Sequence, residues 1–148
     1  MHKQSAGRNG SVGNNLLHAL QEKDAIRLQT YFEVVRGDRG TVFYDPGDNV
    51  RFTYFPCGAS LACYSILLPD GKSAETGAVG GIISHGRLPA YARASVEFAG
   101  EFLRIETAAL EEAKVQSITI QHLFARYADC LLAQVFQSVA CNAAHSIE

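Results

Sequence analysis

The sequence predicts a mainly β fold: a sandwich or roll of short antiparallel strands, with short helices before it and one long helix after it. Segments rich in β-branched and aromatic residues lie between positions 34 and 105, separated by turns of glycine and proline. Two short stretches with helical spacing precede them, and the spacing is helical again from Thr107 onward. A chain of 148 residues suits one domain.

Two short helices are expected at the start. The region 1–13 is polar and rich in Gly, Ser and Asn, which predicts a disordered arm. It contains no apolar segment of the kind that a signal peptide needs. Asn14 or Asn15 is expected to cap the first helix. A second helix should begin near Asp24. The apolar residues expected to face inward from these helices are Leu16, Leu17, Leu20, Ile26, Leu28 and Phe32.

The strands are predicted from β-favouring runs between turn signals. Pro46 and Gly47 mark one turn, and the segment 69–71 marks a hairpin. Several glycines then mark an irregular loop that ends near Gly86. The expected strands are 34–35, 41–44, 52–55, 60–68, 72–78, 91–98 and 101–105.

After the strands, Thr107 is expected to cap a short helix through Ala113, and Ser117 to cap the long helix. No Asp, Glu, Lys or Arg occurs from Cys130 to Ile147, yet polar residues interrupt this stretch too often for a membrane span. One side of the helix should therefore pack on its own domain and another on a second copy, which predicts a homodimer. The alternative is that the whole apolar arc packs on its own domain. The expected interface residues are Tyr127, Leu131, Gln134, Val135, Ser138 and Val139.

Composition argues against several functions. The formal net charge is -2 and no basic stripe occurs, so this chain lacks the electrostatic footprint of a nucleic-acid-binding protein. The four cysteines form no Cys-x-x-Cys pair and, without an export signal, predict reduced thiols in a cytoplasmic protein. The histidines lack the spacing of a metal site. A cupin-like enzyme is the weaker alternative, because His85 is the only histidine between Val34 and Ile105. No catalytic residues and no cofactor are expected.

Several motifs carry a family resemblance. The segments Val42–Asp48, Tyr54–Pro56, Asp70–Glu75 and Ala99–Glu101, followed by Arg126-Tyr127-Ala128, together resemble the sensor domain of Crp/Fnr-type bacterial transcription regulators. The resemblance implies a jelly-roll or β-roll of cyclic-nucleotide-binding type, a parallel dimer along the long helix, and a helix-turn-helix domain after that helix. DNA contact would come only from that domain, which is absent from this sequence.

The resemblance divides the chain into a disordered arm (1–13), a β-roll sensor domain (14–113) and a dimerisation helix (114–148). The function expected is that of a sensor domain coupling an effector signal to DNA binding. The alternative is a stand-alone interaction domain that forms mixed dimers with full-length regulators.

The predicted effector pocket departs from the family pattern. The Arg-Ser position that would hold a cyclic phosphate falls on Ala90-Tyr91, and no Asp or Glu occurs from Gly77 to Ala90. The sequence therefore argues against cAMP binding and leaves open a small-molecule effector of unknown identity. Tyr91 and Phe98 are expected to fill the roll where a purine would lie. The candidate pocket residues are Gly77, Gly80, Gly81, Ser84, His85, Arg87, Tyr91 and Arg93.

Overall fold

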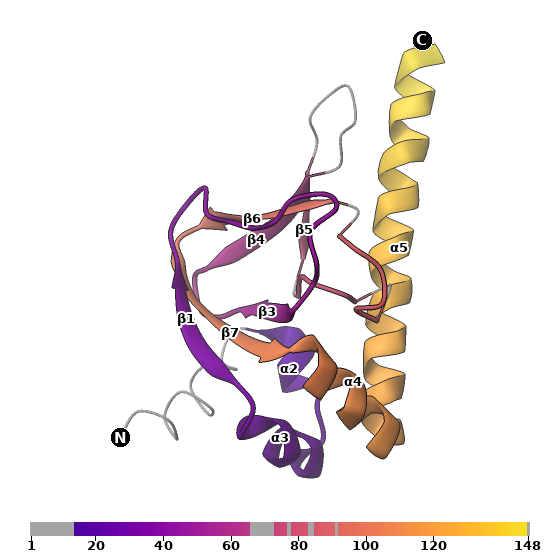
Figure 1. Ribbon diagram of the computed structural model, residues 1–148. Coiled ribbons are helices and arrows are strands. Elements are labelled where there is room, and N and C mark those ends of the chain that lie inside the picture. The colour runs from indigo at the N-terminus through magenta and orange to yellow at the C-terminus, as the bar shows by residue number, and fades with distance from the viewer. Residues whose placement is uncertain (1–13, 66–72, 77, 83–84, 91, 148) are drawn as a thin grey trace.

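The computed structural model describes residues 14–65, 73–76, 78–82, 85–90 and 92–147 (Figure 1). Two short helices are followed by the strands and then by two C-terminal helices. The elements are α2 (Asn15–His18), α3 (Glu22–Gln29), β1 (Glu33–Gly37), β2 (Val42–Tyr44), β3 (Phe52–Pro56), β4 (Leu61–Ser65), β5 (Ser73–Thr76), β6 (Arg93–Phe98), β7 (Gly100–Glu106), α4 (Thr107–Gln116) and α5 (Ile118–Ile147). The predicted mainly β architecture is confirmed, whereas the hairpin expected at 69–71 lies outside the described residues.

The described strands form two antiparallel sheets, ordered β1-β7-β3 and β2-β6-β4-β5. The chain crosses from one sheet to the other between β6 and β7. Glu33 of β1 lies opposite Arg104 of β7, which lies opposite Tyr54 of β3. Because side chains alternate along a strand, this register places these three residues on one face of the sheet.

The β1-β7-β3 sheet separates two apolar cores. On one face Phe55, Leu103 and Ile105 are fully or almost fully buried against the helices. The other face supplies Phe102 to a second core between the two sheets, which also contains Val96. The strict alternation of β7 thus serves both cores, and the helices cover the outer face of this sheet (Figure 1).

Two of the three predicted N-caps, Asn14 and Ser117, are confirmed. The third is wrong: Thr107 is the first residue of α4, its hydroxyl pairs with that of Thr53, and the N-cap position is Glu106, which makes no side-chain capping hydrogen bond. The side chain of Asn14 accepts a hydrogen bond from the N–H of Leu17 at 3.0 Å. It also donates to the carbonyl of Pro56 at 2.8 Å, which ties α2 to the end of β3. Ser117 Oγ accepts from the N–H of Ile120 at 3.4 Å at the start of α5. These side chains satisfy backbone donors that the first helical turn leaves without partners.

Three further predictions of detail are wrong. Ile26 is 60% exposed, and the residue of α3 buried beside Leu28 is Asp24, because hydroxyl groups of a distant segment hold its carboxylate. Phe98 is 55% exposed and does not fill the roll, since it ends β6 at the edge of the inter-sheet core. The first C-terminal helix extends to Gln116 rather than ending at Ala113.

Helix α5 runs alongside the roll, and its C-terminal turns extend past both sheets (Figure 1). Its first half contributes Ile120, Leu123, Phe124 and Leu131 to the core beneath the β1-β7-β3 sheet. In the part of the chain that the structure describes, no helix is both long and apolar enough to cross a membrane.

Candidate functional site

The glycine-rich loop between β5 and β6 is the candidate site, described here over residues 78–82 and 85–90. Near its start Val79 and Tyr54 exchange backbone hydrogen bonds of 2.8 and 2.9 Å. At its end Ala90 exchanges two more with the turn after β2, donating to Asp48 at 2.8 Å and accepting from Gly47 at 2.7 Å. Strand β3 and the turn after β2 therefore fix the two ends of the described loop.

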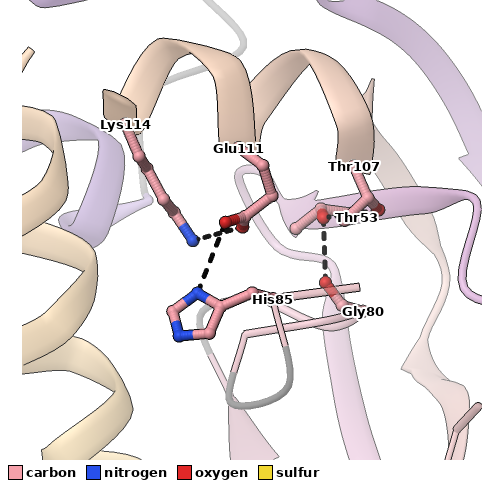
Figure 2. A network of polar contacts seen from close by, with 6 residues as sticks. All are labelled: Thr53, Gly80, His85, Thr107, Glu111 and Lys114. Carbon is pink, nitrogen blue, oxygen red and sulfur yellow. Dashed lines mark hydrogen bonds and ion pairs between the residues drawn. The ribbon is translucent and has the colours of Figure 1, made fainter. Parts of the chain in front are cut away.

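Gly80 approaches β3 too closely for any side chain. Its φ is +109°, and a Cβ built there would lie 2.4 Å from the carbonyl oxygen of Phe52. The buried hydroxyl of Thr53 donates to the carbonyl of Gly80 at 2.8 Å (Figure 2). The Thr53 hydrogen is used in that bond, so the Thr107 hydroxyl donates to Thr53 Oγ1 across 3.2 Å. One buried pair of hydroxyls thus connects the loop, β3 and the first turn of α4.

A second close approach joins the loop to α4. Gly86 has φ +72°, and a Cβ there would lie 2.5 Å from Thr107 Cγ2. Its neighbour His85 is a non-glycine residue with positive φ, at 59°. This strained backbone aims the imidazole at α4 (Figure 2).

Glu111 of α4 links the loop to the C-terminal helices. One of its carboxylate oxygens lies 3.3 Å from His85 Nδ1, and the other accepts from Lys114 Nζ at 2.6 Å (Figure 2). The Lys114 ammonium also lies 5.2 Å from the ring centroid of Phe124 on α5. The side chain of Lys114 is only 7% exposed, and Glu111 and Phe124 stabilise its buried ammonium. The contacts form a continuous path from the loop through α4 to α5.

Tyr127 provides a direct contact between α5 and the loop. Its hydroxyl accepts a hydrogen bond from the backbone N–H of Ala78 at 3.2 Å. The aromatic ring is half-buried against the core beneath the sheet. A displacement of the loop start must therefore move this tyrosine or break its hydrogen bond.

The inner face of the roll is filled with aromatic rings. Phe43 stacks on Tyr54 with centroids 4.0 Å apart, and the edge of Phe102 meets Phe43 at 5.2 Å. The Tyr44 hydroxyl exchanges hydrogen bonds with the backbone of Phe52, accepting at 3.0 Å and donating to its carbonyl. Burial is the main cause that raises the pKa of Tyr44 well above its ordinary value, so this hydroxyl stays protonated.

Sequence reasoning did not single out Arg104, which lies on the β1-β7-β3 sheet between Glu33 and Tyr54. Its guanidinium lies 4.1 Å from the centroid of Phe52, and Nε donates to Glu33 at 3.2 Å. Desolvation lowers the pKa of Arg104, but hydrogen bonds with Tyr54 and Glu33 raise it by more. The alternation of β7 could have revealed it, because Arg104 follows Phe102 by two residues.

The predicted pocket residues do not all converge. Gly81 and His85 lie against α4 and Gly80 lies against β3, whereas Arg87 is exposed. Arg93 lies at the start of β6 and donates from Nε to Asp45 at 2.7 Å. This ion pair belongs to the outer rim of the β2-β6-β4-β5 sheet, away from the contacts with α4. The remaining predicted pocket residues, Gly77, Ser84 and Tyr91, lie outside the described residues.

The predicted dimer residues divide in a similar way. Tyr127 contacts its own loop, and Leu131 is 3% exposed within its own core. Gln134 is exposed. Val135, Ser138 and Val139 belong to α5, but their side chains lie outside the described residues. Two of the six positions are therefore occupied by contacts within one chain.

The described residues contain no group of three His, Cys, Asp or Glu side chains that could hold a metal ion. The groups that this site offers are the backbone groups of the loop, its glycines with positive φ, the imidazole of His85 and the buried ammonium of Lys114.

Comparisons with known proteins agree with this architecture. No protein-family model and no curated protein matches the sequence. Among solved structures, a regulatory subunit of a cAMP-independent protein kinase A from Trypanosoma brucei is similar with a TM-score of 0.72 and 12% identity, over 93% of this chain and 49% of that one. This chain thus spans about half the length of that subunit.

Two bacterial structures match over most of their own length. A putative cyclic nucleotide-binding protein from Geobacter metallireducens has a TM-score of 0.64 at 12% identity, covering 91% of this chain and 98% of that one. The N-terminal domain of a transcriptional regulator from Streptomyces coelicolor has a TM-score of 0.54 at 18% identity, covering 86% and 92%. The chain therefore has the fold of a cyclic-nucleotide-binding-like domain. Two of these similar structures are described as regulatory, one as a regulatory subunit and one as a transcriptional regulator.

Proposed function

We propose that this chain is the sensor domain of a dimeric, cytoplasmic transcription regulator of Crp/Fnr type and has no catalytic activity. In this proposal an effector acts on the loop at 78–90, α4 and α5 transmit the change, and a helix-turn-helix domain outside this sequence binds DNA. The observation that carries the proposal is that the loop contacts both helices, through His85 and Glu111 and through Ala78 and Tyr127. The similar N-terminal domain of the Streptomyces regulator supports it.

The effector proposed is not cAMP. The position where a phosphate-binding Arg-Ser pair would stand carries Ala90-Tyr91, and Arg93 is committed to Asp45. Two similar structures provide a precedent for a β-roll of this type that does not respond to cAMP. One trypanosome kinase subunit is described as cAMP-independent, and another is described as bound to guanosine. A variant of the former, with three substitutions of which one introduces an arginine, is described as bound to cAMP.

The dimer seam is proposed on a face of α5 beside the one that packs on the roll. Leu123, Phe124 and Leu131 are used within the chain. Alternating steps of three and four residues lead through Ala125, Ala128 and Leu132, of which the first is exposed and the others half-buried. Ala128 also packs on the edge of the chain's own core, so the row borders that core. The same spacing continues at Val135 and Val139, two of the positions predicted from sequence. Two alanines in this row would let paired helices approach closely.

The test is the oligomeric state of matched variants, measured by light scattering after gel filtration and by native mass spectrometry. Leu132→Glu should convert a dimer into a monomer, because two carboxylates would face each other in the seam. Ala133→Glu places the same charge on the neighbouring exposed position and should leave the dimer intact. A wild-type chain that stays monomeric at high concentration would overturn the proposal, as would equal effects of the two variants. Calorimetric titration with cAMP should show no binding, and native mass spectra should reveal any co-purified effector.

A further inference from the structure

Asp24 is a buried carboxylate for which the proposed function has no use. It lies on α3 and is only 2% exposed. Both of its oxygens accept hydrogen bonds from a segment more than ninety residues away: Oδ1 from Ser117 Oγ at 2.8 Å, and Oδ2 from Thr119 Oγ1. Burying a carboxylate is costly, so this geometry has to be held by specific contacts. No ion pair of Asp24 occurs among the described residues.

The hydroxyls that hold Asp24 stand at the start of α5. Ser117 directly precedes the helix, and while its hydroxyl donates to Asp24 it accepts from the N–H of Ile120 at 3.4 Å. The negatively charged carboxylate of Asp24 therefore lies next to the N-terminus of a 30-residue helix, hydrogen-bonded to the hydroxyl that caps it. Helix N-termini carry partial positive charge and favour a carboxylate nearby. A residue of α3 thus completes the cap of α5 from a different part of the chain.

A second contact joins the same elements. Arg27, one turn after Asp24 on α3, donates to the side chain of Gln116 at 2.7 Å. Gln116 is the last residue of α4, so the two contacts flank the corner between α4 and α5. Asp24 is buried whereas Arg27 is exposed, so water competes less with the hydrogen bonds of the carboxylate than with that of Arg27.

We propose that Asp24 is a positioning residue that clamps α3 to the first turn of α5, so that these elements move as one unit and the clamp sets the direction of α5 across the roll. An apolar residue of similar size at position 24 could be buried equally well, but it would not fix the orientation of α5, because apolar contacts are not directional. Hydroxyl-to-carboxylate bonds are directional and short. The clamp acts within one chain and holds whether or not the chain forms a dimer.

The experiment measures the orientation of α5 by residual dipolar couplings, comparing α5 amides with those of β6, in the Leu132→Glu background. Asp24→Leu removes both acceptors and should rotate α5 relative to β6. It should also speed amide exchange at Ile120 by about tenfold or more, because the capped turn opens more often. Asp24→Asn keeps an acceptor for Ser117 and a polar partner for Thr119, and should preserve the wild-type orientation. Thr119→Val tests the same clamp from the other side if Asp24→Leu fails to fold, and it should rotate α5 as well.

A control separates positioning from stability. Val96→Ala lowers stability in the core between the sheets, where it touches neither α3 nor α5. The control should leave the dipolar couplings of α5 unchanged. The proposal is overturned if the folded Asp24→Leu or Thr119→Val protein keeps the wild-type orientation, or if Val96→Ala rotates α5 by the same amount. The dipolar couplings do not measure dimer formation, so the clamp can fail this test while the dimer proposal holds, and the reverse.

Discussion

Replacing Thr53 by valine tests whether one buried hydroxyl holds the glycine-rich loop against the roll. Thr53 is fully buried on β3 and donates to the carbonyl of Gly80 at 2.8 Å. It also receives the hydroxyl hydrogen of Thr107 across 3.2 Å. Valine has nearly the same shape, so the substitution removes the hydrogen bonds without opening a cavity. Thr107 is only 4% exposed, and its hydroxyl then loses this acceptor.

The expected loss follows from the burial of these groups. Leaving buried polar groups without a former partner costs about 1–3 kcal/mol in the free energy of unfolding. For a domain of this size that corresponds to a fall in melting temperature of about 3–9 °C. The greater β-propensity of valine offsets only a few tenths of a kcal/mol, on a scale that spans about 1 kcal/mol in all.

The assay is denaturant unfolding of the wild type, Thr53→Val, Thr107→Val and the double variant. This double-mutant cycle isolates the bond between the two hydroxyls, for which we expect a coupling of about 1 kcal/mol. Amide exchange then locates the effect: in Thr53→Val the amides of Gly81 and Gly86 should speed up by a larger factor than those of strand β6, which report only the change in global stability. An additive cycle together with unchanged exchange in the loop would refute the idea that this pair anchors it.

Three further outcomes are expected. Gly80→Ala should lower unfolding free energy by about 2 kcal/mol or more, because its Cβ would meet a backbone carbonyl at a positive φ; thermal denaturation measures this. Burial raises the pKa of the Cys57 thiol, so less of the reactive thiolate exists at neutral pH. Mass mapping should show iodoacetamide modifying exposed Cys130 before buried Cys57, whose modification should increase as the pH is raised. Arg93→Ala should cost less than about 1 kcal/mol in urea unfolding, since its pair with Asp45 is half-exposed.

Local signals in the sequence were sufficient for most of the fold. The capping residues Asn14 and Ser117 mark helix starts correctly, because an N-cap depends only on the next three residues. The turn at Pro46 and Gly47 separates two observed strands for the same reason. Pairing between strands requires contacts distant in sequence, so the residue patterns predicted the strands but not their order in the two sheets.

The site was less accessible to sequence reasoning because its contacts join distant segments. Asp24 shares a helix face with Leu28, four residues later, and that spacing was the available clue to its burial. Its partners Ser117 and Thr119 could not be inferred from it. His85 was selected as a loop residue near an arginine, yet its partner is Glu111 on α4, which only the packing of the loop on that helix reveals.

The contacts along α5 suggest why the helix is long. The Asp24 clamp holds its start at Ser117, and the hydrogen bond from Ala78 meets it at Tyr127, about 15 Å further along at 1.5 Å per residue. Ile147 lies about 45 Å from the start on the same scale. If α3 and α5 turn together as one rigid unit, pivoting at Ser117, a displacement of about 1 Å where the loop meets Tyr127 becomes about 3 Å at Ile147. A small rearrangement of the glycine-rich loop would thereby produce a shift at the far end of the helix comparable to those by which helices switch subunit interfaces.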